Sequence, residues 1–183
     1  MNVTTDLDAR FRAAAAAEGL VDVRYDVVAS PVGDLHVAAT GRGLCRISYR
    51  EDDWEEQLAR GFGVRVLRSP LDDVRRRPSK YSSSSRRTFD LPLDLRVAEF
   101  PAAVLHELAL VPYGQTDTYG KLAARAGRPR AARAVGTIMN RNPIPIVLPC
   151  HRIVGASGAL TGYAGGLEVK RHLLELEGAM FKA

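Results

Sequence analysis

The first half of the chain alternates apolar and polar positions in short runs, as strands with one buried face do. Three such runs are separated by turn segments rich in glycine, and they span residues 25–29, 35–39 and 44–49. Residues 51–60 instead place Trp54 and Leu58 four positions apart, which predicts one face of a helix. The pattern therefore predicts a strand meander and a helix, with one more strand at residues 64–67.

Three other segments of this half have weaker patterns. An alanine-rich stretch at residues 5–19 predicts a short helix. Residues 75–87 hold six basic side chains and a run of serines, and because nothing in them could form a packed face, we expect a solvated loop. Residues 89–95 alternate with period two, but Pro92 predicts an edge or extended segment there.

From residue 100 onward the apolar spacing becomes helical. Helices are expected at residues 100–111, 119–126, 130–139 and 167–177. Thr118 is a good N-cap for the second of these, and a tight turn at residues 127–129 joins it to the third, which predicts a helix-turn-helix. We predict an α+β fold with a domain boundary at residue 96, so that residues 1–96 form an α/β domain and residues 97–183 a mostly helical domain.

Composition and cysteine usage exclude several classes of protein. With 183 residues and 46% hydrophobic content the chain can build a substantial core. No apolar stretch reaches the roughly 18 residues of a membrane span, and the N-terminus lacks the pattern of a signal peptide. Two distant cysteines argue against a disulfide scaffold, so we expect a cytoplasmic protein. Four histidines without clustered spacing give no support for a metal site, and no cofactor is expected.

Charge is distributed unevenly along the chain. Residues 1–100 carry 16 basic and 16 acidic side chains, whereas residues 101–183 carry 10 basic and 5 acidic ones. Residues 118–152 contain seven basic side chains and no acidic one. Such an imbalance around a helix-turn-helix favours a polyanionic partner, although an arginine-rich composition alone could also produce it.

The segment Pro149-Cys150-His151-Arg152 is the strongest candidate for chemistry. It follows a short buried segment at residues 146–148, which Pro149 ends. Because adjacent residues of a strand point to opposite faces, the chain must turn or coil at Pro149 if Cys150 and His151 cooperate. A cysteine at a helix start beside an imidazole and an arginine is expected to have a lowered thiol pKa. The alternative is a small buried hydrophobic residue, which is the interpretation we keep for Cys45.

Residues 112–178 resemble the O6-alkylguanine-DNA alkyltransferases, also called methylated-DNA–protein-cysteine methyltransferases. The matching motifs, in order along the chain, are Pro112-Tyr113-Gly114, Thr118-Tyr119-Gly120, Ala132-Arg133-Ala134-Val135-Gly136, Asn142-Pro143, Pro149-Cys150-His151-Arg152, Gly162-Tyr163 with Gly165-Gly166, and Leu173-Leu174 with Glu177. The first 100 residues match more loosely. The resemblance implies an RNase-H-like N-terminal domain and a winged-helix-like C-terminal domain.

The family's chemistry implies a role for each matching residue. Cys150 would accept the alkyl group from O6 of guanine, and each molecule would react once because the thioether formed is stable. His151 would take the thiol proton through a water, and Glu177 would orient and charge-balance the imidazole, as in a hydrolase triad. Asn142 would brace the turn before the thiol. This implies a single-turnover methylated-DNA–[protein]-cysteine S-methyltransferase acting on O6-alkylguanine and also on O4-alkylthymine.

The resemblance also implies how DNA is held. Arg133 would fill the gap that a flipped nucleotide leaves in the duplex, and Tyr119 would help rotate that nucleotide out and hydrogen-bond to the base. Backbone contacts would come from Gly120, Arg128 and Ala156. The pocket would be lined by Met139, Tyr163, Ala164 and Gly165. The partner would be alkylated double-stranded DNA bound through the minor groove, so the protein would be associated with the nucleoid when bound. It would be monomeric in solution, with cooperativity on DNA left open.

The chain departs from the family at two places, and two other functions remain as alternatives. Some members carry a serine at the position of Ala164, so we expect an altered substrate preference here rather than a loss of reaction. Residues 75–87 stand where relatives usually have a helix. The first alternative is a DNA-binding sensor of alkylation damage without transfer, although such proteins lack the cysteine. The second is a thiol hydrolase built from Cys150, His151 and Glu177.

Overall fold

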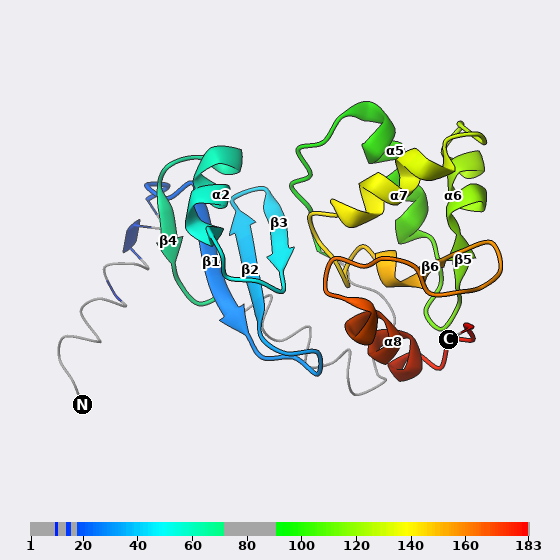
Figure 1. Cartoon of the computed structure of the whole chain (residues 1–183). Coiled ribbons are helices and arrows are strands. Elements are labelled where there is room, and N and C mark those ends of the chain that lie inside the picture. The colour runs from blue at the N-terminus through cyan, green and yellow to red at the C-terminus, as the bar shows by residue number, and fades with distance from the viewer. Residues whose placement is uncertain (1–9, 11–13, 16–17, 72–90, 183) are drawn as a thin grey trace. The chain divides into compact units, whose positions relative to one another are not determined.

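The structure, a computed structural model, describes residues 10, 14–15, 18–71 and 91–182 (Figure 1). The helix predicted at residues 5–19 falls mostly outside the described residues, and the loop predicted at residues 75–87 lies entirely outside them. The described chain divides into two compact units, with residues 91–94 in the first and Leu95 onward in the second. The domain boundary at residue 96 stays a prediction.

The first unit is built on a four-stranded sheet in the order β3-β2-β1-β4. The strands are β1 (Val23–Val28), β2 (Leu35–Thr40), β3 (Gly43–Ser48) and β4 (Val66–Arg68). The first three pair antiparallel, which confirms the predicted meander. The helix α2 (Trp54–Phe62) follows β3, and after it β4 pairs parallel to β1. A parallel neighbour is possible here because a helix connects the strands.

The core of this unit lies between the sheet and α2. Trp54 and Leu58, four residues apart on α2, are both buried against apolar side chains of β1, β2 and β3. Figure 1 shows α2 lying against this sheet. Cys45 is 1% exposed in this cluster, which confirms its interpretation as a small apolar core residue. The predicted helical face is therefore the face that closes the core.

Residues 91–94 lie against the edge strand β3. Leu93 forms an isolated bridge with Leu44, and the backbone N–H of Leu44 donates to the carbonyl of Pro92 at 2.9 Å. Gly43, with φ 140°, accepts this close approach because a Cβ there would lie 2.2 Å from the Pro92 carbonyl oxygen. The described part of the segment thus occupies a sheet edge, where a proline is tolerated.

The second unit is mostly helical. Its helices are α5 (Glu99–Ala109), α6 (Tyr119–Arg125), α7 (Ala132–Asn140) and α8 (Leu167–Leu176), with a short 3-10 helix η1 (Cys150–Arg152). Two short strands, β5 (Asp117–Thr118) and β6 (Ile153–Val154), pair in parallel. These two-residue strands were not predicted, because a run so short shows no period. The α+β prediction, with antiparallel strands in the first unit and helices in the second, is confirmed.

Local signals explain where these helices begin and end. The Thr118 side chain accepts a hydrogen bond from the N–H of Lys121, which is the predicted N-cap of α6. Helix α7 starts two residues later than predicted, because residues 128–131 form a turn closed by the N–H of Ala131 and the carbonyl of Arg128. Gly178 has φ 67° just after α8, as a helix-ending glycine does. In the part of the chain that the structure describes, every helix is too short or too polar to cross a bilayer.

Candidate active site

A tight turn delivers Cys150 to the interior of the second unit. Residues 146–148 are largely buried but do not form a strand. Pro145 and Leu148 bridge each other, and Ile146 adopts a left-handed φ of 73°. After Pro149 the chain coils into η1, so that Cys150 and His151 are 3% and 0% exposed. The expected turn at Pro149 is confirmed, and a helical turn allows both side chains to face the same interior.

Asn142 holds this turn and contacts the thiol. Its amide nitrogen donates to the carbonyl of Leu148 at 2.8 Å and to Cys150 Sγ at 3.1 Å. Its amide oxygen accepts from the N–H of Ile144 at 3.1 Å. One buried side chain therefore fixes the backbone on both arms of the turn and gives the sulfur a hydrogen-bond donor.

The Cys150 thiol is not pre-ionised. Burial raises its pKa to about 11, while the hydrogen bond from Asn142 and the charge of Lys170 act in the opposite direction with smaller effect. The expectation of a lowered thiol pKa was therefore wrong. A helix of three residues offers little dipole, and desolvation of the thiolate outweighs the neighbouring donors. A proton acceptor is needed before this sulfur can act as a nucleophile.

His151 follows Cys150 directly in η1 and is the candidate for that acceptor. Its Nε2 lies 2.8 Å from Glu177 Oε1, and its Nδ1 is buried without a hydrogen-bond partner in the described part of the chain. A carboxylate only accepts hydrogen bonds, so Nε2 carries the proton and Nδ1 has a free lone pair. Burial lowers the pKa of His151, against the raising effect of Glu177, and keeps the imidazole neutral and basic at Nδ1.

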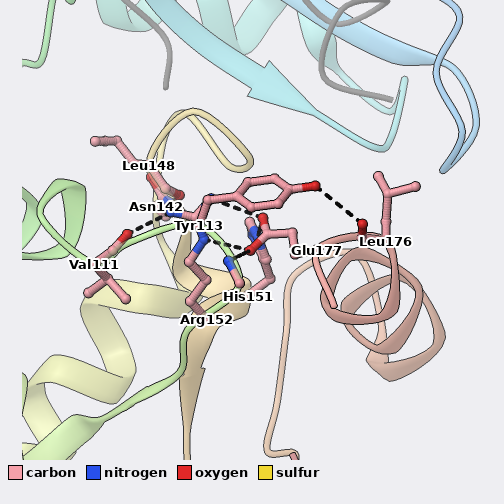
Figure 2. Close-up of polar contacts among 9 residues, drawn as sticks. Val111, Tyr113, Asn142, Leu148, His151, Arg152, Leu176 and Glu177 are labelled. Carbon is pink, nitrogen blue, oxygen red and sulfur yellow. Dashed lines mark hydrogen bonds and ion pairs between the residues drawn. The ribbon is translucent and has the colours of Figure 1, made fainter. Parts of the chain in front are cut away.

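Glu177 is shared between His151 and Arg152, a motif residue to which the sequence analysis gave no contact with Glu177. Arg152 Nε donates to Oε2 and its second terminal nitrogen to Oε1, both at 2.9 Å. Figure 2 shows the Arg152 and Glu177 side chains facing each other. The N–H of Gly114 donates to Oε2 at 3.2 Å. Burial would raise the pKa of Glu177, but hydrogen bonds from His151 and Arg152 and their charges lower it to about 2. The carboxylate is therefore ionised, and its charge is balanced by Arg152.

Lys170 is a residue of the site that sequence reasoning did not find. It is 0% exposed, and its ammonium donates to the carbonyls of Ile153 at 2.6 Å and Thr161 at 2.9 Å. Burial lowers its pKa to about 8, and a negative charge on Cys150 would act in the opposite direction. A lysine on an amphipathic helix is usually solvated, so no sequence signal distinguished it. For Arg152 the adjacent Cys-His pair was a usable signal.

A hollow of about 380 Å³ lies beside this site on the surface of the second unit. It is lined by Tyr119, Ala132, Arg133, Gly136, Asn140, Thr161 and Gly162. The hydroxyls of Tyr119 and Thr161 lie 2.9 Å apart. Burial raises the pKa of Tyr119, and the Thr161 hydrogen bond lowers it. A negative charge on Cys150 would raise it further, so the ionisation of the phenol and that of the thiol are linked electrostatically. The structure thus brings Tyr119 and Arg133 together in one concave surface.

The remaining predicted residues are distributed around this arrangement. Met139 is buried on α7, and the Tyr163 ring meets the His151 ring edge-on with centroids 6.5 Å apart. Gly165 is half-buried next to it and Ala164 is exposed. Gly120, Arg128 and Ala156 are exposed outside the hollow, with the Arg128 guanidinium 4.4 Å from the Phe100 ring centroid. Among the described residues, no group of three or more His, Cys, Asp or Glu side chains could hold a metal ion.

Comparison with known proteins gives a consistent result for both units. Residues 99–179 match the DNA binding domain of 6-O-methylguanine DNA methyltransferase, and residues 23–95 match the ribonuclease-like domain of the same family. The chain therefore belongs to the 6-O-methylguanine DNA methyltransferase family.

Individual relatives resemble almost the whole chain. A methylated-DNA–protein-cysteine methyltransferase of Methanosarcina acetivorans is 37% identical, over 85% of this chain and 98% of that protein. One of Mycolicibacterium paratuberculosis is 42% identical, over 85% of this chain and 92% of the relative. The crystal structure of Mycobacterium tuberculosis OGT in complex with DNA superposes with a TM-score of 0.76 at 38% identity, covering 85% of this chain and 92% of that one.

Proposed function

We propose that the protein repairs DNA by transferring an alkyl group, in a single irreversible turnover, from O6-alkylguanine in a duplex to Cys150. The observation that carries the proposal is the Cys150 sulfur held by Asn142 next to a histidine whose Nδ1 is free to accept a proton. The names of the relatives, methylated-DNA–protein-cysteine methyltransferases, agree with it.

The reaction balances with one proton. The sulfur attacks the carbon on O6, the S–C bond forms, and the C–O bond breaks. The thiol proton passes through a water to His151 Nδ1 and is then released from the imidazolium to solvent, while the departing guanine takes up one proton from solvent at a ring nitrogen, so that both products are neutral. Glu177 stabilises the transient imidazolium, and Arg152 keeps Glu177 ionised. Because the thioether formed on Cys150 is stable in water, each molecule acts once.

Access to the alkyl group requires the nucleotide to leave the duplex. Unstacking costs a few kcal/mol, less for a damaged base, and a side chain inserted into the gap offsets part of that cost. Arg133, exposed on α7 at the rim of the hollow, is the inserted side chain in this proposal, and Tyr119 acts on the everted nucleotide. The DNA backbone is contacted by Gly120, Arg128 and Ala156. The protein binds through the minor groove, whose degenerate base code suits a protein that recognises damage rather than sequence.

The pocket for the everted base is formed in this proposal by Met139 and by the loop of Tyr163, Ala164 and Gly165. The same pocket accepts O4-alkylthymine, since that base also presents an alkylated exocyclic oxygen. The protein acts as a monomer in solution. The seven basic side chains of residues 118–152 predict binding that weakens steeply with salt.

Mass spectrometry tests the proposal directly. After incubation with a duplex containing O6-methylguanine, the Cys150 peptide is expected to gain one methyl group, in proportion to protein and not to time, while the Cys45 peptide stays unmodified. Cys150→Ser should bind the same duplex without transfer. Multiple turnovers, or transfer that survives Cys150→Ser, would refute it. Binding by the unchanged protein without any methyl on Cys150 would support the alternative, a damage sensor.

A further inference from the structure

The hydroxyl of Thr161 touches the one on Tyr119 from a distant part of the chain. The two oxygens are 2.9 Å apart although the residues are 42 positions apart, and either atom could be the donor. Thr161 belongs to the segment between β6 and α8, and Tyr119 is the first residue of α6. Both residues line the hollow beside the candidate active site.

The backbone of Thr161 is fixed from inside the unit. The buried ammonium of Lys170 donates to the Thr161 carbonyl at 2.9 Å and to the Ile153 carbonyl at 2.6 Å. A charge that is 0% exposed and bound to two carbonyls holds the two chain segments together, because releasing either one would leave a buried donor unsatisfied. The Thr161 hydroxyl is therefore presented to Tyr119 from an anchored position.

The Tyr119 ring is restrained on a second side. A Cβ at Gly136 would lie 4.0 Å from two carbons of the ring, so the ring lies over the surface of α7 at a glycine. A tyrosine side chain has two torsions to fix. A ring contact at Gly136 together with a hydrogen bond at the hydroxyl fixes both of them.

The number of protons on the two hydroxyls decides how the pair can work. Each hydroxyl has one proton to donate and lone pairs to accept with. If Tyr119 hydrogen-bonds to a departing base, its own proton points into the hollow, and its oxygen must accept from elsewhere. The Thr161 hydroxyl is the donor within reach. A donor on the phenol oxygen also stabilises the partial negative charge that grows there when Tyr119 donates.

We propose that Thr161 is a positioning residue for alkyl transfer: its hydroxyl donates to the Tyr119 oxygen and thereby aims the phenol proton at the everted base. This inference rests on the proposed function, since it assigns Thr161 a role only in the step that Tyr119 assists. Thr161 makes no contact with the reacting atoms in this scheme and acts entirely through Tyr119.

A double-mutant cycle tests this role. The single-turnover rate of methyl transfer from an O6-methylguanine duplex, at saturating protein, is measured for the unchanged protein, Thr161→Val, Tyr119→Phe and the double variant. Thr161→Val keeps the shape and removes the donor, and should slow transfer on the order of tenfold. Thr161→Ser restores the donor and should stay within about twofold of the unchanged protein. In the Tyr119→Phe background, Thr161→Val should have no further effect.

Thr116→Val is the matched control, because its hydroxyl makes a comparable bond to the carbonyl of Met180 outside the hollow. It should transfer at the unchanged rate. If Thr161→Val slows the Tyr119→Phe protein by the same factor as the unchanged protein, or if Thr161→Ser is as slow as Thr161→Val, the positioning role is overturned. If the unchanged protein places no methyl on Cys150, the proposed function itself fails and this inference with it. Transfer with additive effects overturns only the role of Thr161.

Discussion

Arg152 and Glu177 form a buried ion pair joined by two hydrogen bonds of 2.9 Å. Their side chains are 6% and 0% exposed. An arginine stays protonated at every accessible pH, so it keeps the carboxylate ionised even where desolvation opposes charge. His151, bonded to the same carboxylate, therefore has an anion beside it whose charge is already balanced, and its imidazole can stay neutral until a proton arrives.

Replacing Arg152 should destabilise the protein strongly. Arg152→Met leaves the Glu177 carboxylate buried without its cation, which typically costs about 3–5 kcal/mol of unfolding free energy. Urea unfolding of both proteins measures the difference. Arg171→Met is the matched control, because Arg171 pairs with Glu168 at the surface, and there the loss should stay below about 1 kcal/mol. Equal effects of the two replacements would contradict the importance of the buried pair.

Replacing Asn142 should make the thiol less reactive. Asn142→Ala removes a hydrogen bond that favours the thiolate, so the pKa of Cys150 should rise further above about 11. The rate of alkylation by iodoacetamide, measured at fixed pH values from 8 to 10 in a Cys45→Ser background that leaves one thiol, reports the thiolate fraction below this pKa. The rate at each pH should fall in Asn142→Ala and stay the same in Gln115→Ala, whose side chain is exposed elsewhere. A faster rate in Asn142→Ala would show that Asn142 does not favour the thiolate.

Stability should fall with acid in two steps of known sign. The folded-state pKa of His151 is lowered, so below pH 6.5 the unfolded chain binds a proton that the folded one does not, and stability decreases. The pKa of Glu177 is lowered from 4.5 to about 2, so its contribution is complete above pH 4.5 and is lost as pH falls from 4.5 to about 2. Urea unfolding at intervals between pH 7 and 2.5 measures both steps. Glu177→Gln should flatten the lower one, and an unchanged acid limb in that variant would assign it to other carboxylates.

Replacing Arg133 should separate base eversion from chemistry, if the proposed function holds. Arg133→Ala should slow transfer from duplex DNA at saturating protein by tenfold or more, on the order of the few kcal/mol that unstacking costs. Transfer from the free base O6-methylguanine, which needs no eversion, should keep its rate. Arg141→Ala removes the same charge just beyond α7. Arg141→Ala should weaken DNA binding and reduce its salt dependence without slowing transfer at saturating protein. If both variants slow transfer by the same factor, Arg133 acts only as a phosphate contact.

The elements of the fold could largely be predicted from sequence because local physics specifies them. Period-two alternation marked β1 to β3, the four-residue spacing of Trp54 and Leu58 marked α2, and the Thr118 hydroxyl marked the start of α6. The order of motifs from Pro112 to Glu177 was enough to select Cys150, His151 and Glu177 as candidates. These signals depend on neighbours along the chain, which a sequence displays directly.

The sequence could not show which side chains are buried and which distant residues they contact after the chain has packed. Glu177 meets His151 across 26 positions and Lys170 reaches the loop at Thr161, and such contacts depend on how α8 docks against η1. The sign of the Cys150 pKa shift was mistaken for the same reason: its neighbours in sequence favour the thiolate, but burial disfavours it more. The sequence by itself determined which residues are present and which elements they form. The tertiary structure decided which of them are desolvated and which charges balance one another, because both depend on distances through space.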